Sequence, residues 1–313
     1  GRRSMRSCRA RRCSSESMGR FRERASPSPG GGGSRAKRAG WGDLACFENH
    51  PTPACLSLRS RLRRPSPPRG GCTACGAGAS LVLRPWNFAQ MGLRARDKLA
   101  AQEPDGGGAE QAFLARMARE HRQYVIGGSV PLACDTPTRT KQSLLVYGPD
   151  GTRLARYDKI HLFRYTHGDE DYDEAKTISA GGEPTSFAAP CGRVGLSICY
   201  DVRFPELYRA LGDMTLLVVP AAFTVRTGEA HWETLLRARA IENQCYVLAA
   251  AQTGMHPGGR RTWGHSMLID PWGKIVASQA EGVGVVVGDV DPERIADVRS
   301  KLPAVSHRIL HVT

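Results

Sequence analysis

The chain has 313 residues, of which 41% are hydrophobic and 24% charged, so it is long enough to bury a sizeable core. Its formal net charge is +14, but residues 1–80 hold 17 of the 44 basic and 4 of the 30 acidic residues, which leaves the remainder at +1. This distribution argues against nucleic-acid binding by the folded part, and no run of about 18 apolar residues predicts a membrane span.

The first segment, residues 1–79, is basic and rich in Arg, Ser, Gly and Pro, with neither helical nor strand periodicity. We expect a disordered extension or a gene-model artefact, and the start at Gly1 fits a fragment. A mitochondrial presequence is the less favoured alternative. Six of the ten cysteines lie here, and Cys72 and Cys75 form a lone C-x-x-C pair. We therefore expect mostly free thiols in a reducing, cytoplasmic compartment.

From residue 80 onward, strand and helix patterns alternate. Strand patterns occur at residues 80–83, 124–127, 143–147, 153–157, 194–198, 215–220, 246–252 and 284–290, and a hairpin pattern spans 265–277. Helical patterns occur at residues 109–121, 205–211 and 230–243. This alternation predicts an α/β domain over residues 80–313.

Cys199 is the first candidate catalytic residue, because it joins the strand pattern 194–198 to the helical pattern 205–211. At such a turn a thiol meets the substrate, and backbone N–H groups can bind an oxyanion. Lys159, in YDKIHLF, supplies a cation that would favour the thiolate. Taken alone, a buried core cysteine and a solvated lysine are the commoner fates of these two residue types.

The sequences around both residues, together with AHWETLLRARAIENQCY, WGHSMLIDPWG and LPAVSHR, resemble the nitrilase superfamily of carbon–nitrogen hydrolases. The resemblance covers residues 80–313 and is nearest to the deaminated glutathione amidase and omega-amidase types. It implies a four-layer α-β-β-α sandwich that forms a homodimer and uses no cofactor. It also implies a Glu–Lys–Cys triad, with Lys159 and Cys199 as two of its members.

Two acidic positions of the family pattern affect the expected mechanism. Glu174 matches a second glutamate that many members carry after the lysine, whereas the general-base glutamate is replaced by Trp86 in residues 81–88 (LVLRPWNF). Arg84 resembles an inserted residue, and the first strand and helix of the family are expected to be altered or missing. Loss of a positioned base costs about 10²–10⁴-fold in rate, so we expect this chain to have little or no activity.

The resemblance implies hydrolysis of a small amide that bears a carboxylate, through a cysteine thioester. The substrate would be deaminated glutathione or, as the alternative, 2-oxoglutaramate. Arg203 is either a carboxylate clamp or a structural partner of nearby acids. Tyr200, Phe223 and His231 are further candidates for the substrate pocket, whereas Trp232 is expected in the core. His161 and His167 lack a second cluster of ligands, so no metal site is expected.

Three alternatives belong to other classes of function. A Cys–His hydrolase would pair Cys199 with His265 or His307, but the motif around Lys159 disfavours it. A non-catalytic scaffold is favoured by Trp86, which cannot act as a base. A nucleic-acid-binding protein would use the basic residues of the N-terminal segment alone.

Overall fold

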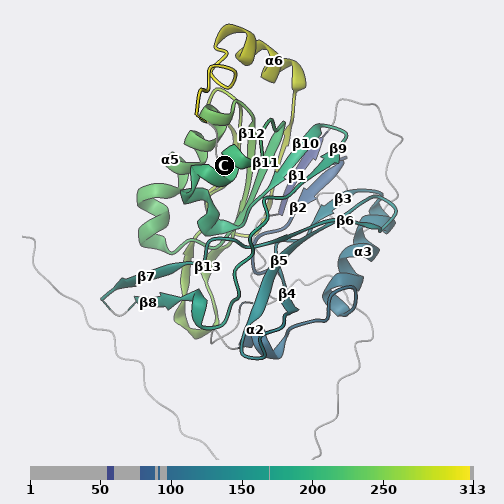
Figure 1. Cartoon of the computed structure of the whole chain (residues 1–313), viewed down its shortest axis with the longest axis vertical. Coiled ribbons are helices and arrows are strands. Elements are labelled where there is room, and N and C mark those ends of the chain that lie inside the picture. The colour runs from purple at the N-terminus through teal and green to yellow at the C-terminus, as the bar shows by residue number, and fades with distance from the viewer. Residues whose placement is uncertain (1–54, 60–77, 89–90, 92–96, 169, 311–313) are drawn as a thin grey trace, which may run out of the picture. The chain divides into compact units, whose positions relative to one another are not determined.

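The computed structural model describes residues 55–59, 78–88, 91, 97–168 and 170–310, which belong to the compact unit Cys46–Thr313 (Figure 1). Within this unit two β-sheets pack face to face. Helix α5 (Val225–Asn243) covers one sheet through β12 and β15, and helix α3 (Ala109–His121) covers the other through β3 and β5. Figure 1 shows this succession of helix, sheet, sheet and helix, so the four-layer α-β-β-α architecture is confirmed.

The first sheet has the strand order β17-β1-β2-β3-β5-β4, with β6 beside β5. Its strands are β1 (Cys55–Arg59), β2 (Leu81–Leu83), β3 (Tyr124–Ile126), β4 (Val130–Ala133), β5 (Thr140–Tyr147), β6 (Arg153–Asp158) and β17 (Val285–Asp289). The second sheet has the order β16-β15-β12-β11-β10-β9. Its strands are β9 (Ser186–Ala189), β10 (Gly192–Leu196), β11 (Leu216–Ala221), β12 (Tyr246–Ala251), β15 (Ser266–Ile269) and β16 (Ile275–Gln279).

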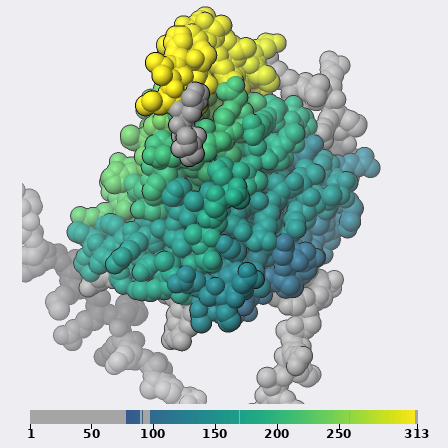
Figure 2. Space-filling model, in the orientation of Figure 1, coloured from purple at the N-terminus to yellow at the C-terminus, as the bar shows by residue number. Residues whose placement is uncertain are grey.

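Two small hairpins and several short helices complete the described unit. The hairpins are β7 (Arg164–His167) with β8 (Glu170–Asp173) and β13 (Thr253–Met255) with β14 (Arg261–Trp263). The other helices are α2 (Asp97–Ala100), α4 (Pro205–Ala210), α6 (Pro292–Lys301) and the 3₁₀ turns η1 (Glu174–Lys176), η2 (Cys199–Arg203) and η3 (Pro257–Gly259). Helix α6 and the residues after it, yellow in Figures 1 and 2, lie at one end of the unit.

The strand period of two residues decides which side chains fill which layer. In β5, Leu144 and Val146 belong to the apolar cluster between the two sheets. The alternate residues Leu145 and Tyr147 belong to the cluster beneath α3, together with Leu114. Because the buried strands β11 and β12 are apolar throughout, both faces of the second sheet are covered, as expected for parallel strands between layers.

The periodic segments match their predicted positions within a few residues, and the largest difference is at α5, which begins five residues earlier than expected. Thr224 explains this start, since its side chain caps the helix by accepting from the Thr227 backbone N–H. The sequence pattern did not predict β1, which pairs in parallel with β17 and antiparallel with β2. Five residues within a Pro- and Arg-rich stretch give too short a pattern to recognise. The predictions for residues 1–54 and 60–77 lie outside the described residues.

Four cysteines that the structure describes, Cys134, Cys191, Cys199 and Cys245, are free thiols. Trp232 is in the core as predicted, with its Nε1 donating to the His265 carbonyl at 2.8 Å.

Across the described ranges, every helix is too short or too polar to cross a membrane.

Gly228 provides a test of the packing between α5 and the β13–β14 hairpin. A Cβ at this position would lie 2.3 Å from Cγ and 2.4 Å from Cβ of Trp263. Overpacking of this kind costs about 1–3 kcal/mol, which exceeds the gain of about 1 kcal/mol that alanine brings to a helix interior. We expect Gly228→Ala to lower the free energy of unfolding in urea by about 1–2 kcal/mol.

Gly182→Ala is the matched control, because a Cβ there meets nothing within 4 Å. Equal stability of the two variants would contradict the packing described for α5.

Candidate active site

The candidate site lies at the carboxyl ends of three parallel strands. Strands β10, β11 and β12 run in the same direction, so their last residues share one edge of the second sheet. Cys199 follows β10, Phe223 follows β11 and Gln252 follows β12. Such an edge is where open α/β sheets bind their ligands.

Cys199 occupies a strained backbone position at the first residue of η2. Its φ is +51°, a left-handed conformation that non-glycine residues rarely adopt. The side chain is 5% exposed and faces the backbone N–H of Ala222. Strand β10 ends at Leu196 and α4 begins at Pro205, so a 3₁₀ turn separates them instead of an immediate helix start. The predicted turn is therefore present, with Cys199 at its tightest point.

Lys159 follows β6 and is fully buried. Its Nζ lies 2.5 Å from Oε2 of Glu174, and the same oxygen accepts the Phe163 backbone N–H at 2.8 Å. Burial of an ammonium is tolerated only when an opposite charge and hydrogen bonds compensate for lost water. The structure thus brings Lys159 and Glu174 into one ion pair, and the charges of both act on the Cys199 thiol.

Asp201 connects the lysine loop to the cysteine turn, a role that the sequence analysis did not identify. Its carboxylate is fully buried and accepts the Tyr157 hydroxyl at 2.7 Å and the Ile198 backbone N–H at 2.8 Å. It also accepts the His161 backbone N–H at 3.0 Å and lies 2.8 Å from His161 Nδ1. These four contacts fix residues 157–161 against residue 198, which sets the distance between Lys159 and Cys199.

Trp86 follows β2 of the first sheet and points at the buried ammonium. Its side chain is 2% exposed, and the Lys159 Nζ lies 4.1 Å from the indole centroid, a cation–π contact. The Trp86 backbone is held by Ser129, whose N–H donates to the Trp86 carbonyl at 2.7 Å. Next to it, Asn87 and Gln252 exchange two hydrogen bonds, Asn87 N to Gln252 Oε1 at 3.1 Å and Gln252 Nε2 to the Asn87 carbonyl at 3.2 Å. Trp86 therefore belongs to the site although it lies on the other sheet.

Arg84 continues the pairing of a strand, and its interpretation as a residue inserted relative to the family pattern remains a prediction. Its backbone N–H donates to the Ile126 carbonyl at 2.9 Å and so continues the pairing of β2 with β3. The ladder therefore extends one residue beyond Leu83, without a bulge at Arg84.

The pocket beside Cys199 is almost filled. Its free space is about 10 Å³, enough for a single water molecule, whereas small-molecule pockets usually hold about 300–1,000 Å³. Trp86 is among the side chains that close it. Residues that line the pocket are Trp86, Phe163, Cys199, Tyr200, Ala222, Phe223, Thr224, Thr227 and Arg260.

Two of the predicted substrate-binding residues, Tyr200 and Phe223, line this pocket, and the other two do not. The Arg203 guanidinium lies 5.7 Å from the Tyr200 ring centroid and 5.4 Å from that of Phe223, and its Nη1 is 3.3 Å from His231 Nδ1. Arg203 and the exposed His231 thus contact each other outside the pocket lining, and their roles in substrate binding remain predictions. Arg260, which the sequence analysis did not single out, does line the pocket.

The histidines named for a Cys–His pair lie elsewhere. His265 stacks on Trp263 with ring centroids 4.2 Å apart, and His307 is exposed in the segment after α6. Neither lines the Cys199 pocket in the described part of the chain, so the geometry gives no support to a Cys–His hydrolase. Nor do the described residues contain a group of three or more His, Cys, Asp or Glu side chains that could hold a metal ion.

Burial and charge act in opposite directions on Cys199. Burial raises the pKa of its thiol above the ordinary value, and the Lys159 ammonium lowers it by a smaller amount. The Lys159 ammonium thus favours the thiolate as expected, but desolvation has the larger effect on the pKa of the thiol. At neutral pH the thiol form predominates, and removal of its proton requires an acceptor.

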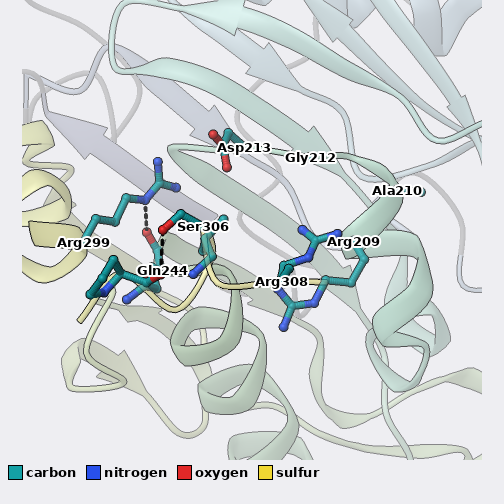
Figure 3. Close-up of a pocket in the computed structure, with 10 residues that line it drawn as sticks. Arg209, Ala210, Gly212, Asp213, Gln244, Arg299, Ser306 and Arg308 are labelled. Carbon is teal, nitrogen blue, oxygen red and sulfur yellow. Dashed lines mark hydrogen bonds between the residues drawn. The ribbon is translucent and has the colours of Figure 1, made fainter. Parts of the chain in front are cut away.

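A second pocket, of about 560 Å³, lies beside the segment that follows α6 (Figure 3). Figure 3 shows Arg209, Arg299 and Arg308 around it, with Gln244 between them and Asp213 nearby. It shares no described lining residue with the Cys199 pocket, so the two pockets are distinct.

Comparisons with known proteins agree with this geometry. The family model described as carbon–nitrogen hydrolase matches residues 65–300. A deaminated glutathione amidase from Synechocystis sp. is 43% identical over 238 residues, which cover 74% of this chain and 87% of that protein. The human omega-amidase NIT2 is 38% identical over 234 residues, which cover 74% and 83%. The solved structure of the C. elegans NitFhit protein is 34% identical with a TM-score of 0.69, and the match covers 82% of this chain and 65% of that one.

The opposing effects on Cys199 predict its pH-dependent reactivity. Iodoacetamide consumes the thiolate, so alkylation of Cys199 should rise with pH around a midpoint above the usual value of about 8.5. Lys159→Met removes the ammonium that lowers this pKa. We expect the midpoint to move to still higher pH and the rate at pH 7 to fall about 10-fold, as one pKa unit implies.

Peptide mass spectrometry distinguishes alkylation of Cys199 from alkylation of the other thiols. Lys274→Met is the matched control, because it removes the charge of an exposed lysine. An unchanged midpoint in Lys159→Met would show that the ammonium does not act on the thiol.

Proposed function

The chain belongs to the carbon–nitrogen hydrolase family, and we propose that it hydrolyses a small carboxylate-bearing amide in the manner of the deaminated glutathione amidases. The observation that carries the proposal is the strained Cys199 beside the buried Lys159–Glu174 ion pair. A thiol, an ammonium and backbone N–H groups at one sheet edge are the components that acyl transfer needs. The similarity to amidases supports the same chemistry.

The proposed reaction proceeds through a thioester. The Cys199 sulfur attacks the amide carbon, and the Lys159 ammonium stabilises the negative oxygen of the tetrahedral intermediate. The amide nitrogen takes up a proton and leaves as ammonia or an amine. Water then attacks the thioester, which releases the carboxylic acid and returns the proton to sulfur. Glu174 holds Lys159 in place through the 2.5 Å contact and acts as a positioning residue.

Trp86 limits this reaction in two ways. An indole ring cannot accept the Cys199 proton, and Glu174 Oε2 is already engaged by Lys159 and Phe163. The ring also fills space that an amide would need, so side chains must move before substrate binds. Both features support the alternative of a non-catalytic protein. For an active enzyme, 2-oxoglutaramate is the alternative substrate, since omega-amidases are among the relatives.

Replacing Trp86 by glutamate tests whether a base at this position is what amide hydrolysis by this chain requires. The backbone of Trp86 is held by Ser129, and its side chain already reaches the Lys159 ammonium, so a glutamate at this position would place a carboxylate at the ion pair. We expect Trp86→Glu to raise ammonia release from 2-oxoglutaramate, or product release from deaminated glutathione, by about 10²–10⁴-fold.

Trp86→Gln is the matched control, because glutamine opens the pocket to the same extent but supplies no base. If Trp86→Gln gains as much turnover as Trp86→Glu, the ring acts as a plug and the base is not the missing component. If neither variant turns over either amide while both remain folded, the amidase proposal fails for this chain.

Assembly and location remain proposals. We propose a homodimer, which is supported by apolar surface on α5 and the adjacent β15–β16 turn, where Ile241 is 48% and Trp272 57% exposed. Four free thiols support the proposed cytoplasmic location.

A further inference from the structure

Two hydrogen-bond donors in the lining of the Cys199 pocket lack acceptors among the residues that the structure describes. Trp86 Nε1 and Arg260 Nε are both buried without a hydrogen-bond partner. Lys98 Nζ makes no hydrogen bond or ion pair with any residue that the structure describes, and it lies 4.8 Å from the Trp86 ring centroid. Buried donors without acceptors are costly and rare in folded proteins. Trp86 Nε1 and Arg260 Nε therefore need an acceptor that the described residues do not supply, and Lys98 adds a partly exposed cation beside them.

Lys98, on the short helix α2, is a second cation next to the ring that contacts Lys159. The titratable groups that face it are Glu174, Lys159, Arg260 and Cys199. Of these, Glu174 alone is an anion at pH 7, because Lys159 and Arg260 are cations and the Cys199 thiol is neutral. Glu174 cannot neutralise Lys98 by hydrogen bonding through Oε2, because that oxygen is held by Lys159 and Phe163. Lys98 therefore adds a positive charge to the site that no described carboxylate pairs with.

Arg260 approaches the same pocket from the turn between η3 and β14. Its Nη2 donates to the Ala222 carbonyl at 3.1 Å, and its guanidinium lies 5.2 Å from the Tyr172 ring centroid. No ion pair holds it among the described residues, although its charge acts on both Cys199 and Lys98. The hydrogen bond to the residue after β11 fixes the guanidinium at the pocket wall and leaves Nε free for a ligand.

We propose that Lys98 and Arg260 form an anion-recognition pair that selects carboxylate-bearing reactants for Cys199. The neutral Lys159–Glu174 pair leaves these two cations uncompensated, and an acceptor-rich group would satisfy their free donors. A carboxylate fits this requirement, since it is ionised at pH 7 and binds guanidinium and ammonium groups strongly. The inference rests on the proposed function only in assigning this carboxylate to an amide substrate.

The charge on Lys98 gives the selection a pH dependence. Burial lowers the pKa of Lys98 to about 8, so its ammonium is present at pH 7 and is lost as the pH rises through about 8. Arg260 keeps its charge over this range. Preference for anions should therefore be largest at neutral pH and should weaken, without vanishing, in alkaline solution.

The test compares alkylation of Cys199 by iodoacetate, an anion, with alkylation by the neutral iodoacetamide. Both reagents consume the same thiolate, so the ratio of their rates cancels its ionisation and reports the charge around the sulfur. We expect Lys98→Gln and Arg260→Gln each to lower this ratio about 3- to 10-fold at pH 7, as loss of one nearby unit charge implies. In the parent chain the ratio should also fall above about pH 8, whereas in Lys98→Gln it should stay flat.

Lys274→Gln and Arg261→Gln are the matched controls. Each substitution removes one positive charge, as the site variants do, but from an exposed residue whose charge is screened by solvent and salt. Unchanged ratios in the two site variants, or an equal drop in Arg261→Gln, would overturn the proposal, and circular dichroism confirms that each variant is folded. The alkylation needs no amide turnover. A drop in the ratio with no amide hydrolysis would refute the proposed function alone, and hydrolysis with an unchanged ratio would refute this inference alone.

Discussion

The constraint on which the site depends is the burial of one ammonium group. Lys159 is fully shielded from water, and its charge persists because Glu174 binds it at 2.5 Å and Trp86 offers it a ring face. An uncompensated charge at this depth would cost several kcal/mol, so the contact between Lys159 and Glu174, the first residue of η1, stabilises the fold. Because Cys199 lies beside this pair, the same interaction that stabilises the fold sets the charge around the thiol.

Two buried polar connections keep the nucleophile and the cation in register. Asp201 joins the backbone of Ile198 to the loop of His161, and the Asn87–Gln252 exchange joins the first sheet to the end of β12. The site is thus assembled from both sheets, and its precision comes from hydrogen bonds that are satisfied within the protein.

The sequence could predict the elements whose patterns are long, and less of what surrounds the thiol. The boundaries of α3 were predicted correctly because thirteen residues repeat with helical period. Cys199, Lys159 and Glu174 could be proposed as site residues because they stand within motifs, and the structure brings the Lys159–Glu174 pair close enough for its charges to act on Cys199. Lys98 and Arg260 could not be singled out, since both belong to polar stretches without periodicity and only the tertiary fold brings them near Trp86 and Cys199. The direction of the pKa of Cys199 was also missed, because burial depends on packing that no local pattern reports.

The most direct measurement of the central claim is intact-mass spectrometry of the chain after reaction with an activated anionic ester such as 4-nitrophenyl hydrogen succinate. A good leaving group reduces the need for a base, so a nucleophile in a cationic site should still acylate while its thioester hydrolyses slowly. We predict one succinyl group on Cys199, removable by hydroxylamine and absent from Cys199→Ser, while the half-buried Cys134 stays unmodified. Acylation of Cys134 in preference to Cys199, or no adduct on the folded chain, would contradict the assignment of Cys199 as the nucleophile.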